Sequence, residues 1–156
     1  MSSTSTWGIP RECALPAVVA AVSAAVCFGA LALAMASPWA WALYAASTLF
    51  SVLVMVVVAW LTAHWLGVGF GTVGAALLKF LAVTLAGEAA WVLAGWLPSG
   101  VDGPARLLAW TAVFVVLMQS FFELSLAETV VFVVLLLVVR FVVGFLLAVA
   151  ILSRFA

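Results

Sequence analysis

Residues 74–98 read GAALLKFLAVTLAGEAAWVLAGWLP, an apolar run that is long enough to cross a membrane as a single helix. A helix needs about 20 apolar residues to cross a hydrocarbon core of about 30 Å. Two charged side chains interrupt the run, Lys79 near its start and Glu88 at its centre. The fold must therefore accommodate a lysine and a glutamate inside an otherwise apolar segment.

The composition of the whole chain is that of an integral membrane protein. Hydrophobic residues make up 70% of the 156 residues, and the chain has only 5 basic and 5 acidic residues. Soluble domains carry about 25% charged residues. Because lipid leaves backbone groups without partners, apolar runs of this length are expected to be helices, and they lack the alternation typical of barrel strands. We predict an all-α, polytopic transmembrane helix bundle that forms one domain over residues 1–156, as a multi-pass protein of the cell inner membrane.

The sequence divides into five predicted membrane-spanning helices. Turn-forming residues separate them: Ser37-Pro38 after the first, four glycines between residues 67 and 74 after the second, and the segment 98–104 after the third. The second helix is the longest, so we expect it to tilt or to extend beyond the bilayer. An odd number of spans places the two termini on opposite faces. The predicted helices cover residues 15–36, 39–66, 72–97, 106–122 and 126–152.

The first span has one feature of a secretion signal. Arg11 precedes it, and it ends in Ala34-Met35-Ala36, a small-x-small pattern typical of cleavage sites. The apolar run of about 20 residues is longer than the core of a usual signal peptide. We therefore expect an uncleaved first helix, with a cleaved signal as the alternative.

Tryptophans mark both ends of the second span. Trp39 and Trp41 lie at one end, and Trp60 and Trp65 lie at the other, which favours positions at the two head-group levels. His64 lies at the second end, and no further histidine or cysteine accompanies it. We expect His64 to be a hydrated interfacial residue rather than a ligand or a proton relay.

A short connection separates the last two predicted helices. Ser125 is followed three residues later by Glu128, the spacing of a capping box that opens a helix. Helices joined by so short a segment run antiparallel. We predict that the last two helices form an antiparallel hairpin, with Glu123 as a solvated charge at its turn rather than a cation ligand.

Lys79 and Glu88 cannot neutralise each other, because nine residues at about 100° each place them on opposite sides of one helix. Lys79 lies within about two turns of the interface, and its long side chain can reach the head groups. Glu88 lies about 15 Å from the helix end at Pro98, near the bilayer centre. A carboxylate at that depth must be protonated, hydrated or paired with a cation.

Arg140 is the cation that we predict to pair with Glu88. It lies near the middle of the fifth predicted helix, at similar depth, and arginine does not lose its proton in proteins. We predict an interhelical ion pair that docks the third helix against the fifth. Gly144, one turn after Arg140, would leave room for the close approach.

Small residues recur at four-residue spacing on two of the predicted helices. Such stripes allow helix backbones to approach closely, although alanine-rich helices also produce them by chance. If the two stripes face each other, the third helix lies at the centre of the bundle. The stripes are Ala82, Ala86, Ala90 and Ala94 on the third helix, and Ala17, Ala21, Ala25 and Gly29 on the first.

The sequence favours a non-catalytic role. It contains no set of nucleophile and base, no pair of histidines, no cofactor or metal motif, and no basic stripe typical of nucleic-acid binding. The leading hypothesis is a scaffold, accessory or assembly subunit in the lipid bilayer, alone, as a homo-oligomer or within a larger membrane complex. The alternative is a proton- or ion-conducting carrier that uses Glu88. Secondary candidate residues are His64, Lys79, Thr84, Gln119, Ser120 and Glu123.

One resemblance to a known family is carried by the C-terminal third. The run FFELSLAET (residues 121–129) and the apolar helix with Arg140 that follows it resemble small bacterial proteins related to the Yip-domain superfamily. Eukaryotic members of that superfamily are five-helix proteins with a cytosolic N-terminus that act in vesicle trafficking and contact small GTPases. The chain lacks their Asp-Leu-Tyr-Gly-Pro motif, so the resemblance implies the five-helix layout and a cytosolic N-terminus, but not GTPase binding.

Overall fold

The computed structural model of the chain describes residues 11–34, 38–96 and 102–153, and within these ranges it contains helices and no strands. All five helices are long and apolar enough to cross a membrane. The prediction of an all-α membrane bundle is therefore confirmed. The helices are α1 (Arg11–Ala34), α2 (Pro38–Leu66), α3 (Val73–Ala94), α4 (Asp102–Phe122) and α5 (Leu126–Leu152).

Two helices begin four residues earlier than the sequence predicts. α1 starts at Arg11 and contains Pro16 in its second turn. α4 starts at Asp102, so that Pro104 falls in its first turn, where a missing backbone N–H breaks no intrahelical hydrogen bond. The sequence prediction places Gly103 and Pro104 in the connection before the fourth helix, although the first turn of a helix tolerates proline. Residues 1–10, 35–37, 97–101 and 154–156 lie outside the described residues.

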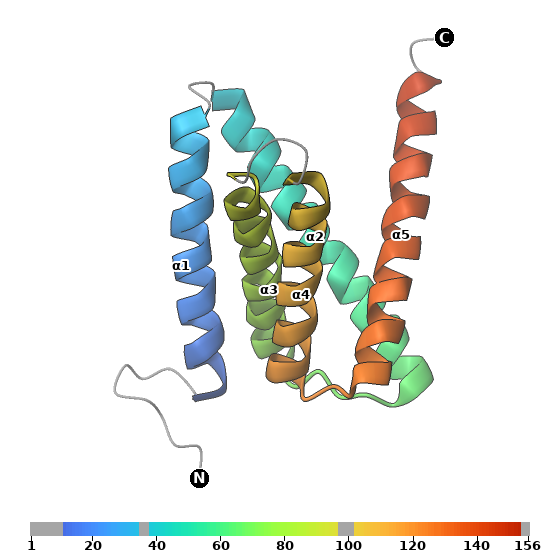
Figure 1. Cartoon of the computed structure of the whole chain (residues 1–156). Coiled ribbons are helices and arrows are strands. Elements are labelled where there is room, and N and C mark those ends of the chain that lie inside the picture. The colour runs from blue at the N-terminus through green and yellow to red at the C-terminus, as the bar shows by residue number, and fades with distance from the viewer. Residues whose placement is uncertain (1–10, 35–37, 97–101, 154–156) are drawn as a thin grey trace.

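The helices form an open bundle with α3 at its centre (Figure 1). α3 packs most extensively against α1 and α4, which flank it, and it also contacts α2. α2 crosses obliquely behind this layer, and α5 packs mainly against α2. The central position of α3 agrees with the prediction, but α3 and α5 are not closely packed, so the predicted docking of these two helices is wrong.

The oblique course of α2 follows from its length. It has 29 residues, which corresponds to about 44 Å and exceeds the thickness of a hydrocarbon core. Its exposed tryptophans lie near its two ends, Trp39 at the first and Trp60 and Trp65 at the second. Trp41, by contrast, is partly buried and stacks on Phe28 of α1, with ring centroids 5.6 Å apart. The three exposed tryptophans are thus placed as expected for side chains at the two head-group levels.

A cluster of phenylalanines joins the helices at one end of the bundle. Phe80 and Phe122 stack with ring centroids 4.8 Å apart, and Phe70 from the α2–α3 connection meets Phe122 edge-on at 5.3 Å. These rings join α3, α4, α5 and the α2–α3 connection in one core. The phenylalanine cluster consists of Phe70, Phe80, Phe114, Phe122 and Phe132.

The turn between α4 and α5 forms the predicted capping box. The Ser125 backbone N–H and hydroxyl both donate to the Glu128 carboxylate at 2.7 Å, and the Glu128 backbone N–H donates back to the Ser125 hydroxyl at 3.3 Å. The two helices run in opposite directions from this turn (Figure 1). They then diverge, because α5 packs on α2 and makes only limited contact with α4.

The contact between α1 and α3 forms as predicted, but α1 presents a different face to it. Ala20, Ser23 and Cys27 are buried, whereas Ala21 and Gly29 of the predicted stripe are exposed. A Cβ atom added at Gly29 would meet nothing within 4 Å. Small residues surround α1 on several sides, so their spacing alone could not identify the face that packs. On α3, Ala82 is buried, and Ala86, Ala90 and Ala94 are partly buried.

Candidate functional site

A cleft of about 530 Å³ opens where α5 diverges from the rest of the bundle. All of α2, α3, α4 and α5 contribute to its walls. Most of the lining is apolar, with Met55, Val92 and Leu137 among the contributors. The polar lining residues are Tyr44, Ser47, Ser51, Thr84, Glu88 and Arg140.

Glu88 is the acidic group of the cleft. Its side chain is partly buried, and both carboxylate oxygens accept from the Thr48 hydroxyl, at 3.4 and 3.5 Å. These distances are long for a hydroxyl donor, which usually lies about 2.7–2.8 Å from its acceptor. The carboxylate is therefore held only weakly by the protein and remains available to a further partner.

Tyr44 places a second polar group beside Glu88. Its hydroxyl oxygen is buried and has no hydrogen-bond partner among the described residues. Its polar neighbours are the side chains of Cys27 and Glu88. Tyr44 also lines two adjoining cavities, one of about 670 Å³ beside α1 and one of about 580 Å³ that is almost entirely apolar. A buried phenol without a partner is uncommon, and a small shift would let it donate to the carboxylate.

The hydroxyl groups near Glu88 come largely from α2, and the sequence analysis missed them. Tyr44, Thr48, Ser51 and Met55 follow one another at spacings of three or four residues, so they share one face of the helix. Thr48 and Ser51 are buried on this face. Three polar residues at helical spacing in an otherwise apolar span were the signal that could have identified them.

Arg140 lines the same cleft but does not form the predicted ion pair with Glu88. Its side chain is exposed, and within the described part of the chain it has neither a hydrogen bond nor an ion pair. The reason is that α5 packs on α2 rather than on α3, which leaves the cleft between the two charges. Gly144 is likewise exposed, and a Cβ atom there would meet nothing within 4 Å, so it makes no close approach.

Lys79 is held by the protein, although we expected it to extend to lipid head groups. Its ammonium donates to the backbone carbonyl of Phe121 at 2.6 Å and lies 5.2 Å from the centre of the Phe122 ring. The last carbonyls of a helix have no partner within that helix and carry partial negative charge. Lys79 thus caps the C-terminal end of α4 and ties it to α3.

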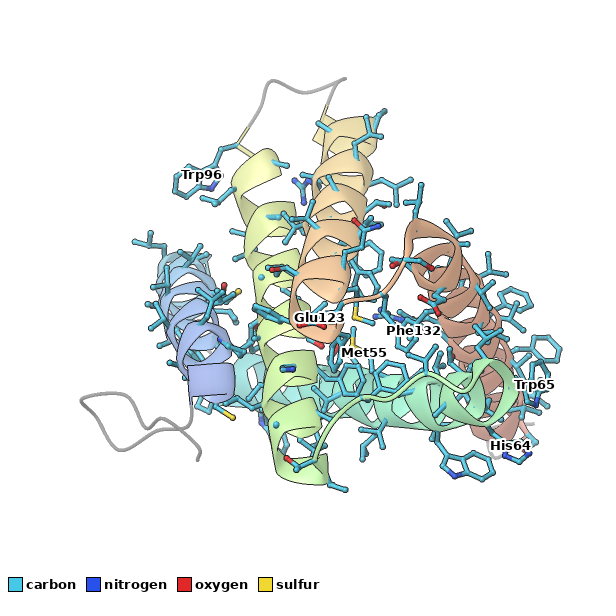
Figure 2. All side chains as sticks on the ribbon, turned by 90° about the horizontal axis from the view of Figure 1, so that it is seen from below. Met55, His64, Trp65, Trp96, Glu123 and Phe132 are labelled. Carbon is cyan, nitrogen blue, oxygen red and sulfur yellow. The ribbon has the colours of Figure 1, made fainter. Side chains whose placement is uncertain are left out.

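Among the other candidate residues, Thr84 lines the cleft and the rest do not. Glu123 is exposed in the α4–α5 turn, and Gln119 is partly buried one turn before it. His64 is exposed and stacks on Trp60 with ring centroids 6.2 Å apart. Seen from below, His64 and Trp65 point away from the bundle, whereas Met55 and Phe132 lie among the helices (Figure 2). The described residues contain no group of three histidine, cysteine or acidic side chains that could hold a metal ion.

Gly87 of α3 and Gly95, which directly follows this helix, allow α4 to approach closely. A Cβ atom at Gly87 would lie 2.8 Å from Nε1 of Trp110, and one at Gly95 would lie 2.5 Å from the guanidinium of Arg106. Trp110 in turn lines the cleft and stacks on Phe114 at 5.1 Å. The α3–α4 contact therefore fixes one aromatic wall of the cleft.

The cleft combines features of a binding site within a membrane. A carboxylate with only a weak hydroxyl donor can accept a proton or a cationic group.

No protein-family model, no characterised protein and no solved structure matches the chain. The resemblance to Yip-domain relatives therefore stays a prediction.

Proposed function

We propose that the protein is a non-catalytic membrane carrier that takes up a proton or another cation at Glu88. The observation that carries the proposal is that Glu88 and Arg140 line one cleft without pairing. Removing a carboxylate from water is costly unless a cation or hydrogen bonds compensate it. A weakly held carboxylate beside a cavity fits a group whose partner arrives and leaves.

The phenylalanine cluster makes the proposed carrier a gated one. Its rings fill the bundle below the cleft, where Phe80, Phe114 and Phe132 are almost fully buried. A cation at Glu88 therefore has no open route to that end of the bundle, and passage requires helices to move. α5 is the helix suited to this movement, because it packs mainly against α2 and makes only limited contact with α4.

A scaffold, accessory or assembly subunit is the second candidate function. The observation in its favour is the tight packing of α3 between α1 and α4, reinforced by the bond from Lys79 to the end of α4. A rigid three-helix layer suits a subunit that positions other membrane proteins or further copies of this chain. The five apolar helices support a multi-pass membrane location for either function.

The substitution Glu88→Gln distinguishes the two functions. Glutamine keeps an oxygen that can accept from Thr48, so we expect the free energy of unfolding to change by less than about 1 kcal/mol. It cannot bind a proton or cation by charge, so flux of protons or alkali cations into proteoliposomes should be lost. Flux is measured with a pH-sensitive or ion-sensitive dye inside the vesicles, under an imposed gradient.

Glu123→Gln is the matched control, because it removes an exposed carboxylate that lies outside the cleft. This variant should retain the flux of the unmodified protein. The scaffold function is supported instead if Glu88→Gln leaves flux unchanged but lowers stability, and if adding Arg140→Leu partly restores that stability. Such a result would show that the two charges compensate each other in the folded bundle.

A further inference from the structure

We infer that the cleft binds a zwitterion, with the ammonium group of the ligand at Glu88 and its phosphate or carboxylate at Arg140. The inference rests on the proposed function and names the class of substrate. It starts from the fact that two opposite charges line one cavity and do not touch. A ligand that carries both complementary charges would satisfy both side chains at once.

The charges of the two side chains select this ligand class. Arg140 has five N–H donors, and within the described residues none of them is used. Guanidinium groups bind phosphates and carboxylates through paired hydrogen bonds. Glu88 offers an acceptor to an ammonium group at the opposite wall. A zwitterion would give each of the two charges a partner in an apolar setting.

The aromatic walls strengthen the assignment of the ammonium end. Tyr44 and Trp110 line the cleft together with Glu88, whereas the Trp91 ring already lies 5.9 Å from the guanidinium of Arg106. The faces of aromatic rings attract cations, and tryptophan does so most strongly. A cleft that combines a carboxylate with Tyr44 and Trp110 has the groups expected for binding an ammonium group.

The size and surroundings of the cleft fit a small zwitterion or the head group of a lipid. Its volume of about 530 Å³ lies within the range of small-molecule sites, about 300–1,000 Å³. The chemistry is shared by a free zwitterionic solute and by a phospholipid of the surrounding bilayer. The experiment below separates these two sources.

The test compares three soluble probes for binding to the purified full-length chain in an uncharged detergent. Glycerophosphoethanolamine carries both charges, ethanolamine carries only the cation, and glycerol phosphate carries only the anion. We expect the zwitterion to bind at least about tenfold more tightly than either single-charge probe, because it makes both charge-assisted contacts and each of the other probes makes one. Equilibrium dialysis with radiolabelled probes gives the three dissociation constants without any substitution in the protein.

Variants then assign each end of the ligand. Glu88→Gln and Arg140→Gln should each weaken binding of the zwitterion at least about tenfold, and Glu123→Gln should not change it. Arg140→Gln should leave ethanolamine binding unaffected. Each variant is first checked for an unchanged melting temperature. Competition by phosphatidylethanolamine at lower concentrations than the soluble zwitterion identifies lipid as the source, and its absence identifies a solute.

Two outcomes overturn the inference. One is equal affinity for ethanolamine and for the zwitterion together with no effect of Arg140→Gln. If Glu88-dependent flux is present in that case, the proposed function stands and only the zwitterion is wrong. The other is a lack of binding by all zwitterionic probes, the lipid included. Persistence of flux in Glu88→Gln is a separate result, which rejects the proposed function independently of the ligand measurements.

Discussion

Glu123 adopts a left-handed backbone conformation, with φ of 54°, directly after the last residue of α4. This conformation is common at the position that follows a helix, where glycine is usually found. For a residue with a Cβ atom it costs about 1–2 kcal/mol. Among the non-glycine residues that the structure describes, no other has a positive φ. The α4–α5 turn therefore stores strain at one identifiable residue.

Replacing Glu123 should reveal this strain. We expect the Glu123→Gly variant to be more stable than the Glu123→Ala variant, with a free energy of unfolding higher by about 1 kcal/mol. The reason is that glycine adopts positive φ without steric conflict. Both variants lose the same carboxylate, so alanine controls for the charge. Unfolding in mixed micelles, followed by tryptophan fluorescence, measures the difference. Equal stability of the two variants, or a more stable alanine variant, would contradict the assigned backbone conformation.

The similar level of Glu88 and Arg140 along the bundle was predictable from the sequence, but the partner of each charged side chain was not. Counting residues placed Glu88 and Arg140 at similar depth, and they do line one cleft. The same reasoning gave Lys79 an interfacial position and missed its bond to Phe121. Depth follows from position within one helix, whereas a partner depends on how helices rotate and cross. Every residue has a backbone carbonyl, so the sequence does not indicate which of them accepts a hydrogen bond from a side chain.

Helix packing around α3 depends on the two glycines that face α4. Gly87 lies against the edge of Trp110, and the distances there leave no room for a methyl group. Gly144 of α5 has open space around it, although it was the glycine that the sequence analysis assigned to close packing. The two positions therefore form a natural pair for testing which interface is tight.

We expect Gly87→Ala to lower the free energy of unfolding by about 1 kcal/mol or more, because overpacking outweighs the better helix propensity of alanine. Gly144→Ala should be neutral or stabilising by up to about 1 kcal/mol, because only the propensity changes. Unfolding curves of both variants, collected under identical detergent conditions, provide the comparison. A stabilised Gly87→Ala variant would show that Trp110 does not occupy the assigned position.

The five helices and the α4–α5 turn could be predicted from local sequence patterns. The side of each helix that packs against its neighbours could not. Hydrophobic length defined all five helices, and Ser125 with Glu128 defined the start of α5. The faces of α1 and α5 remained open because both helices are apolar around their whole circumference. In lipid, apolar residues face either protein or acyl chains, so the usual contrast between buried and exposed sides is missing.

The bundle as a whole is tightly packed on one side and open on the other. The layer of α1, α3 and α4 is closely packed, whereas α5 is attached mainly through α2 and the turn from α4. α1 begins at one end of the bundle, and α5 finishes at the opposite end (Figure 1). This arrangement agrees with an odd number of membrane crossings.

Labelling of engineered cysteines tests this topology. Gly69 lies in the exposed α2–α3 connection and Ser153 follows α5, so Gly69→Cys and Ser153→Cys should face opposite sides of the membrane. Both are made in a chain whose Cys13 and Cys27 are replaced by alanine. In sealed vesicles of uniform orientation, a membrane-impermeant maleimide should label one variant before permeabilisation and the other only afterwards. Labelling of both from the same side would exclude five crossings.

The phenylalanine cluster also bears on how the cleft meets the surrounding lipid. Its rings occupy the end of the bundle where α3 and α5 begin, so the cleft is closed towards that half of the membrane. Glu88 and Trp91 follow Phe80 along α3, and Arg140 follows Phe132 along α5, so these residues lie beyond the cluster, towards the end where α5 finishes. The packed rings therefore separate the cleft from the end of the bundle where α3 and α5 begin. A path along the bundle axis from Glu88 to that end would require these rings to move, so the two ends of the molecule are not equivalent.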